Sequence, residues 1–127
     1  MINKIYKEES IPYSMVSERK IAYDYDPELD ILHVYNDKIK NGIIGCLTMD
    51  CFNVDIGQEN LVVGVEVECA SEVLHLPKET LTSLDEASLI VQKMGNTLFI
   101  GIGAIKGLQR SSVRFNVKTE EVCMIPN

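Results

Sequence analysis

The chain has 127 residues, 46% hydrophobic and 24% charged, a composition that predicts one folded domain over 1–127 and excludes an intrinsically disordered chain. Its 19 acidic residues outnumber its 12 basic ones, so the protein is acidic with a net charge of −7. The nearest approach to a basic cluster consists of Arg110, Arg114, Lys106 and Lys118. Nucleic acids and anionic membranes require denser cation clusters, so we expect neither as a partner.

Residues of alternating polarity predict a mainly β fold (α+β by a strict count) made of antiparallel hairpins. The first hairpin is expected from Ile21–Tyr25 and Ile31–Tyr35, which are rich in β-branched and aromatic residues. Between them, the Asp26 carboxylate can accept backbone hydrogen bonds and Pro27 fixes φ, a combination typical of a tight turn. In residues 1–20 we expect only a strand near Tyr13–Val16.

The centre of the chain predicts two more strands. Phe52–Ile56 alternates, with polar residues at its second and fourth positions. Leu61–Cys69 is the longest predicted strand. Regular alternation would place Val62, Gly64 and Glu66 on the face opposite to its remaining valines.

After Ala70 the alternation stops, and the helix-start residues Ser71 and Pro77 predict one or two short helices near residues 71–87. Alternation then returns, with Gly95-Asn96 as the tight turn of a hairpin. The remaining predicted strands are Leu89–Val91, Leu98–Ile105, Val113–Val117 and Val122–Ile125.

A short recurrence raises the question of internal symmetry. The tripeptide Phe-Asn-Val at residues 52–54 recurs at residues 115–117, and each copy follows a predicted hairpin. We therefore expect either two similar halves, 21–70 and 88–125, joined by the helical stretch, or a chance match of three residues.

The chain contains four cysteines: Cys46, Cys51, Cys69 and Cys123. Its start, Met1–Glu9, carries charges where a signal peptide would be apolar, so we expect a cytoplasmic protein with free, reduced thiols. The cysteine spacing lacks the paired ligands of a zinc site, and the glycines do not form a phosphate-binding loop. We expect no cofactor.

Two blocks of sequence carry a family resemblance: Tyr25-Asp26-x₃-Asp30-x-Leu32-His33-Val34 and Val63-Gly64-Val65-Glu66-Val67-x-x-Ala70-Ser71. Together they resemble a prokaryotic family of small uncharacterised proteins, domain of unknown function 2283, over residues 23–74. The resemblance implies a small β-rich fold without an established activity, and it carries over no catalytic residue. His33 stands where that family usually has Tyr, and the second half of the chain has no counterpart in it.

Two groups of polar residues could carry chemistry. Asp24, Asp26 and Asp30 crowd one turn, where they either shape the turn or bind a cation; turn chemistry explains them without an ion. His33 and Glu66 would share a face if their strands belong to one sheet. They would then form either an acid–base pair or a structural one.

Apolar and glycine residues on strand faces predict an interface between copies or with a partner. One set consists of Ile31, Tyr35, Val62 and Gly64, and the other of Phe99, Gly101 and Gly103. Exposed apolar faces require a cover, and flat glycine patches permit another backbone to approach closely.

The functional expectation follows from these surfaces and from the lack of a catalytic motif. We expect a non-enzymatic small β domain that self-associates as a homo-oligomer or binds a protein partner. The alternative is a small metal-dependent or acid–base enzyme that uses His33, Glu66 and the acidic turn, with Cys46 or Cys51 as optional further groups.

Overall fold

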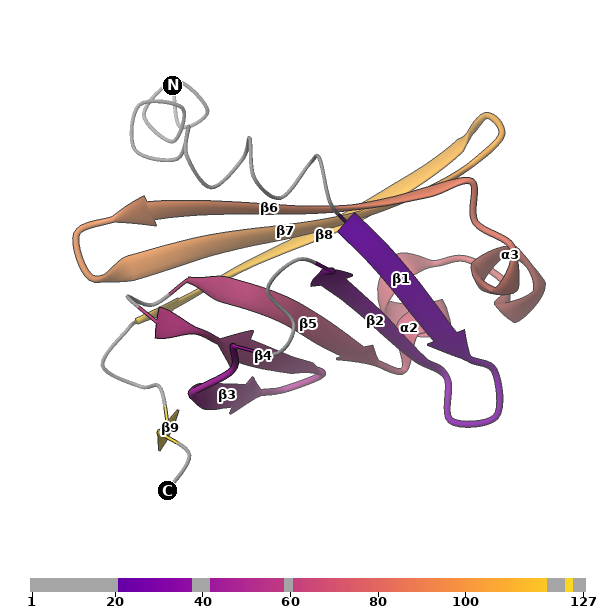
Figure 1. Cartoon of the computed structure of the whole chain (residues 1–127). Coiled ribbons are helices and arrows are strands. Elements are labelled where there is room, and N and C mark those ends of the chain that lie inside the picture. The colour runs from indigo at the N-terminus through magenta and orange to yellow at the C-terminus, as the bar shows by residue number, and fades with distance from the viewer. Residues whose placement is uncertain (1–20, 38–41, 59–60, 119–122, 125–127) are drawn as a thin grey trace.

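The fold is given by a computed structural model that describes residues 21–37, 42–58, 61–118 and 123–124. Over these residues the fold is mainly antiparallel β, with two sheets and two short helices, as the alternation predicted (Figure 1). The expected strand near Tyr13–Val16 lies outside the described residues. None of the helices described is long and apolar enough to cross a membrane.

The larger sheet has six strands in the order β1-β2-β5-β4-β3-β9, and all neighbours are antiparallel. Their bounds are β1 Ile21–Asp26, β2 Ile31–Asn36, β3 Gly45–Met49, β4 Phe52–Ile56, β5 Val62–Glu68 and β9 Cys123–Met124. The β1–β2 turn forms as expected. Asp26 Oδ1 accepts hydrogen bonds from the backbone N–H groups of Glu28 at 2.9 Å and Leu29 at 3.1 Å.

The smaller sheet is a meander of three strands: β6 Glu86–Met94, β7 Thr97–Lys106 and β8 Gln109–Lys118. Its two turns have two residues each and begin with Gly95 (φ 61°) and Gly107 (φ 59°), the positive φ that a type II′ turn requires at that position. These hairpins make β7 and β8 10 residues long, against 7 for β5. The prediction that Leu61–Cys69 is the longest strand was therefore wrong: β5 ends before Cys69, which adopts a left-handed conformation (φ 52°), and the turn at Gly107 lets β7 and β8 extend to 10 residues each.

The core lies between the two sheets, and the strands of the smaller sheet cross over those of the larger one (Figure 1). The helices α2 (Ala70–Leu74) and α3 (Lys78–Thr82) supply further core side chains. The Ser111 hydroxyl donates a hydrogen bond to the Leu74 carbonyl and so ties α2 to β8. Core side chains from both sheets and both helices include Leu32, Val34, Val54, Val65, Leu74, Leu81, Leu89, Leu98 and Ile100.

A β-bulge changes the faces at the start of β5. Asp55 pairs with Gly64, but Ile56 pairs with Val62, so Val63 is the extra residue. Val62, which we expected on the outer face beside Gly64, lies in the core and is 2% exposed. The expectation was wrong because alternation assumes a regular strand, and one inserted residue reverses the face of every residue before it.

The two Phe-Asn-Val copies occupy different positions in their sheets. Residues 52–54 lie in β4, between β3 and β5, whereas residues 115–117 lie in β8, which pairs with β7 alone among the described strands. The first residues of the two copies meet in the core, where the Phe52 and Phe115 rings stack with centroids 4.1 Å apart. The division into halves 21–70 and 88–125 stays a prediction.

Candidate functional site

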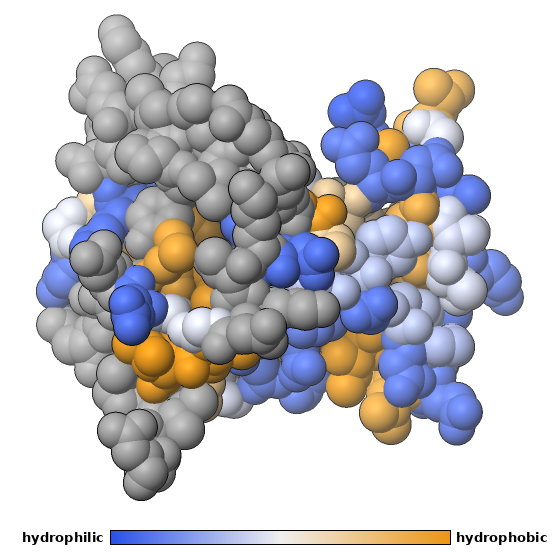
Figure 2. Space-filling model, in the orientation of Figure 1, coloured by the Kyte–Doolittle hydropathy of each residue, from blue (hydrophilic) through white to orange (hydrophobic). Residues whose placement is uncertain are grey.

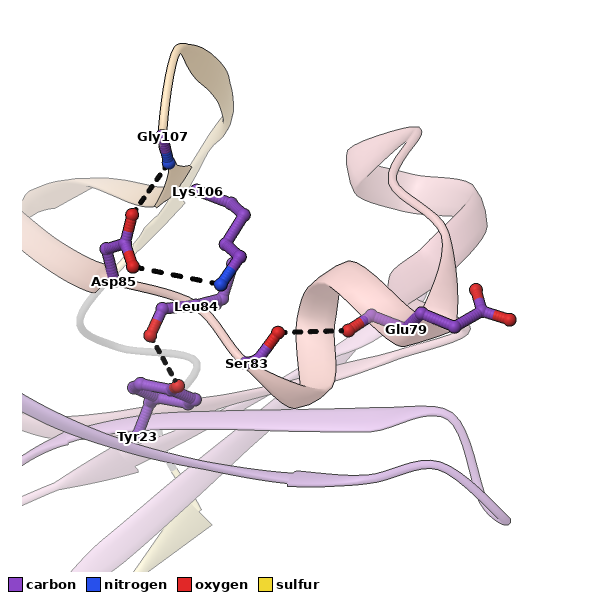
Figure 3. A network of polar contacts seen from close by, with 7 residues as sticks. All are labelled: Tyr23, Glu79, Ser83, Leu84, Asp85, Lys106 and Gly107. Carbon is purple, nitrogen blue, oxygen red and sulfur yellow. Dashed lines mark hydrogen bonds and ion pairs between the residues drawn. The ribbon is translucent and has the colours of Figure 1, made fainter.

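The hairpin that joins β7 and β8 has a fixed tip. The Gly107 N–H donates a hydrogen bond of 2.7 Å to Asp85 Oδ2, and Lys106 Nζ lies 3.9 Å from Asp85 Oδ1 (Figure 3). Asp85 is itself held, because its backbone N–H donates to the Ile105 carbonyl at 2.8 Å. The carboxylate at the start of β6 therefore fixes the end of the neighbouring hairpin.

This tip presents an apolar side chain to solvent. Leu108 is 102% exposed, and in Figure 2 hydrophobic surface projects from the end of this hairpin. Leu84 and Asp85, which precede β6, are linked to the larger sheet, because the Tyr23 hydroxyl on β1 donates a 2.8 Å hydrogen bond to the Leu84 carbonyl (Figure 3). Leu108 is thus an exposed leucine on a supported turn.

The strand that follows, β8, is an edge strand with no partner on its outer side among the described residues. Lys106 and Gln109 flank the two-residue turn and form a hydrogen-bonded pair. From this pair onward, hydrogen-bonded and non-hydrogen-bonded residue pairs alternate along β7 and β8. Arg110, Ser112 and Arg114 consequently sit in non-hydrogen-bonded pairs with β7. Their backbone N–H and C=O groups point toward the open edge.

The side chains of β8 differ on its two faces. The outer face is basic: β8 contains three cations and no acid in a protein of net charge −7, and exposed Arg110 and Arg114 form no ion pair within the described residues. The inner face is apolar but incompletely covered. Val113 and Phe115 are half-buried, whereas Ile102, the partner of Val113 on β7, is 1% exposed.

The predicted pair His33 and Glu66 does share the outer face of the larger sheet. β2 and β5 are adjacent, and the two residues lie directly opposite each other in the register. The carboxylate that the imidazole approaches, however, is that of Asp55 on β4, with 3.7 Å between His33 Nε2 and Asp55 Oδ2. This nitrogen has no hydrogen-bond partner in the described structure, so the arrangement is a loose ion-pair contact and not an aligned acid–base pair.

The interface set on this face differs from the expectation. Gly64 is buried beneath the His33 and Tyr35 rings, whose centroids are 4.7 Å apart. The expectation that Gly64 is open to a partner was wrong, because its neighbours on β2 fold over it. With Val62 in the core, only Ile31 and Tyr35 of this set remain partly exposed.

The residues of the second interface set do share one face of a strand. Phe99, Gly101 and Gly103 lie along the outer face of β7, and all three are half-buried. Gly101 is opposite Ile90 on β6 and Arg114 on β8, so apolar surface borders directly on the basic face of β8.

The three aspartates near the first turn do not converge. Asp24 Oδ2 accepts a hydrogen bond from the Tyr35 hydroxyl at 3.1 Å, and Asp26 accepts those of its own turn. Asp30 contacts the start of α2 through Ser71. Because each carboxylate has separate partners, the cation alternative gains no support, and the described residues contain no group of three or more His, Cys, Asp or Glu placed to hold a metal.

Asp30 is the centre of a structural network. Its carboxylate accepts hydrogen bonds from the Tyr25 hydroxyl at 2.7 Å, the Ser71 N–H at 3.0 Å and the Ser71 hydroxyl at 2.6 Å, and its carbonyl accepts from the Ala70 N–H. Burial opposes ionisation, but the hydrogen bonds from Ser71 and Tyr25 outweigh it and lower the pKa of Asp30. Burial and the hydrogen bond to Asp30 raise the pKa of Tyr25.

The surroundings of one described cysteine, Cys69, make its thiol less reactive. Cys46, Cys51 and Cys69 are free thiols, and the backbone of Cys123 on β9 lies opposite that of Cys46 on β3. Desolvation and the nearby Glu72 carboxylate raise the pKa of Cys69. A raised thiol pKa lowers the thiolate fraction, which is the reactive form. The reducing cytoplasm expected from the sequence stays a prediction.

Comparisons of the chain with protein-family models, with curated proteins and with solved structures found no match. The resemblance to domain of unknown function 2283 therefore stays a prediction. Its two sequence blocks do meet in space, because Asp30 of the first block accepts hydrogen bonds from Ser71 of the second, while the Tyr25 hydroxyl donates to the same Asp30 carboxylate.

Sequence reasoning missed the edge of β8. The sequence did contain a signal, since the apolar residues Val113, Phe115 and Val117 alternate with polar ones that include Arg114, with Arg110 on the same face. From the sequence, these cations form a basic cluster that is too sparse for nucleic-acid binding. Which strand forms the edge of a sheet is decided by strand order, and alternation does not reveal it.

Proposed function

We propose that the protein is a non-enzymatic protein-binding module that takes an extended segment of a partner as an additional strand beside β8. The observation that carries this proposal is the open edge of a 10-residue strand, where alternate residues direct backbone donors and acceptors away from β7. Strand addition uses such groups for affinity and the side-chain faces for specificity. The half-buried Val113 and Phe115 would gain cover from the added strand.

The enzyme alternative has weaker support. His33 lies opposite Glu66, but its Nε2 approaches Asp55 at 3.7 Å without a hydrogen bond. Acid–base catalysis requires groups within hydrogen-bond reach of each other or of a substrate, and the His33–Asp55 contact is longer than that.

Self-association is a second candidate, favoured by the outer face of β7. Phe99, Gly101 and Gly103 lie on one face beside Ile90; the Ser88 side chain covers Gly103, so a second copy could approach closely at Gly101. Light scattering coupled to size exclusion at micromolar concentration measures the mass. A dimer or larger species supports this candidate, and a monomer contradicts it.

The strand-addition proposal is tested with a displayed library of random peptides and matched variants of Ser112. Proline at this position removes an N–H group that points to the open edge, while leaving the hydrogen-bonded pairs with β7 in place. Ser112→Ala is the control, because it keeps the N–H and loses only the hydroxyl. Asn116→Pro is a second variant at the same edge, in case Ser112→Pro lowers the stability.

Peptides that bind the wild type and Ser112→Ala, but neither proline variant, support strand addition at β8. Circular dichroism and thermal unfolding confirm that each variant is folded before binding is measured. Peptides that bind the proline variants as well as the wild type, or a library without binders, contradict the proposal.

A further inference from the structure

The charge on β8 specifies the partner more closely than its backbone does. Arg110 and Arg114 lie four residues apart on the outer face and have no acidic partner among the described residues. The protein has a net charge of −7, so two unpaired arginines on an open strand edge differ in charge from the protein as a whole. Opposite charges on directly facing residues of neighbouring strands stabilise the pair, and like charges destabilise it.

We infer that the segment which binds beside β8 is an acidic strand, with carboxylates on alternate residues of one face and apolar side chains on the other. The carboxylates would face Arg110 and Arg114, and the apolar side chains would extend the inner face over Val113 and Phe115. This inference rests on the proposed function and adds the chemical class of the partner.

A second copy of β8 fits this edge poorly. In the symmetric antiparallel register centred on Arg114, that residue would face its own copy and Arg110 would face Lys118. If the two copies of β8 are shifted by one residue pair in either direction, Arg114 still lies diagonally across from an arginine of the other copy. An acidic strand of another protein avoids this repulsion.

The hairpin tip supplies an anchor at one end of the same edge. Leu108 is fully exposed, precedes β8 directly and stands on a turn fixed by the hydrogen bond from Gly107 to Asp85. A partner strand that extends past Arg110 would reach Leu108 and could bury it against an apolar residue. The expected recognition pattern is therefore alternating acidic and apolar, with an additional apolar contact at the end near the turn.

The probe is a blocked nine-residue peptide of sequence TVEVTVEVT, compared with TVQVTVQVT, in which only the two charges are removed. The sequence reads the same in both directions, so it presents its carboxylates four residues apart in a parallel or an antiparallel strand. Binding is followed by NMR titration of the ¹⁵N-labelled full-length protein, which also locates the bound strand through the amide shifts of β8.

We expect the acidic peptide to bind on the order of tenfold more tightly than the neutral one at low salt, from two cross-strand charge pairs. Arg114→Gln should lower that ratio, and Lys78→Gln, which removes one exposed cation from α3, should leave it unchanged. The ratio should fall at high salt because exposed charge pairs are screened.

The outcomes separate this inference from the function on which it rests. Equal binding of the two peptides, lost in Ser112→Pro, overturns the acidic preference and leaves strand addition intact. An acidic preference that persists in Ser112→Pro overturns strand addition, because the contact is then electrostatic only. Binding of neither peptide overturns both. Tighter binding of single-stranded DNA through Arg110 and Arg114, or dimerisation abolished by Ser112→Pro, also overturns the inference by naming a different occupant.

Discussion

Replacing Gly64 by alanine should destabilise the protein, because the outer face of β5 is covered at that point. A Cβ at this position would lie 2.8 Å from Tyr35 Cβ and 3.0 Å from the Val34 carbonyl oxygen. Non-bonded carbon atoms pack at about 3.5–4.0 Å, so the contact requires a movement of β2. The nearest atoms belong to a backbone and to a Cβ, and a rotamer change cannot move them away.

The size of the effect follows from two opposing contributions. Overpacking costs about 1–3 kcal/mol. Restricting the unfolded chain by replacing glycine stabilises the fold by about 0.4–1 kcal/mol. We therefore expect Gly64→Ala to lower the free energy of unfolding by about 1–2 kcal/mol, which corresponds to a decrease in Tm of roughly 3–10 °C for a domain of this size.

Gly101→Ala is the matched control in the other sheet. A Cβ there would meet Arg114 Cγ at 3.8 Å and the Ile90 carbonyl at 4.0 Å, which is ordinary contact, so this substitution should stabilise by about 0.4–1 kcal/mol. Urea unfolding followed by circular dichroism measures both variants. The reasoning is refuted if Gly64→Ala is as stable as the wild type, or if both substitutions shift the stability in the same direction.

Three further predictions concern stability. The lowered pKa of Asp30 means that its ionised carboxylate stabilises the fold above the unfolded pKa, near 3.8, and that this contribution disappears as the pH falls through the folded value. Ser71→Ala should therefore cost about 1 kcal/mol in urea unfolding at pH 7, and the difference from wild type should shrink at pH 2; an equal loss at both values would contradict this account. Phe115→Ala removes the ring stacked on Phe52 and should cost about 2–3 kcal/mol, measured by the same unfolding assay, and a loss below 1 kcal/mol would show that the stack contributes little. Asp85→Ala should speed amide exchange at the β7–β8 tip, read by NMR, with a loss of about 0.5–1 kcal/mol; unchanged exchange there would mean that the carboxylate does not hold the turn.

The first hairpin and the Gly95 turn were predicted from local patterns, whereas β3 (Gly45–Met49) and the turn at Gly107 were not expected. The first hairpin needs only alternating strands and an aspartate that can accept its turn's N–H groups, and both are local properties. The Gly95 turn was also readable, because only glycine adopts the required positive φ without strain. β2 and β5 are neighbours in one sheet, so His33 and Glu66 share a face as expected; their direct opposition comes from the register, which alternation does not set.

The errors have a common origin in pairing between distant segments. The bulge at Val63 arises from the pairing of β5 with β4, and it moved Val62 into the core. The cover over Gly64 comes from His33 and Tyr35 on another strand. Neither event changes the local polarity pattern, so alternation within one segment cannot predict it.

The candidate binding surface shows the same division. The sequence by itself determined that Val113, Phe115 and Val117 alternate with polar residues, including Arg114. It also determined the acidic net charge against which the arginines of β8 stand out. Only the tertiary structure decided that β8 ends its sheet, that its arginines have no ion pairs among the described residues and that Asp85 fixes the turn at Leu108. The physical reason is that local polarity sets the faces of a strand, whereas the order of strands, and therefore the open edge, depends on contacts between segments far apart in the chain.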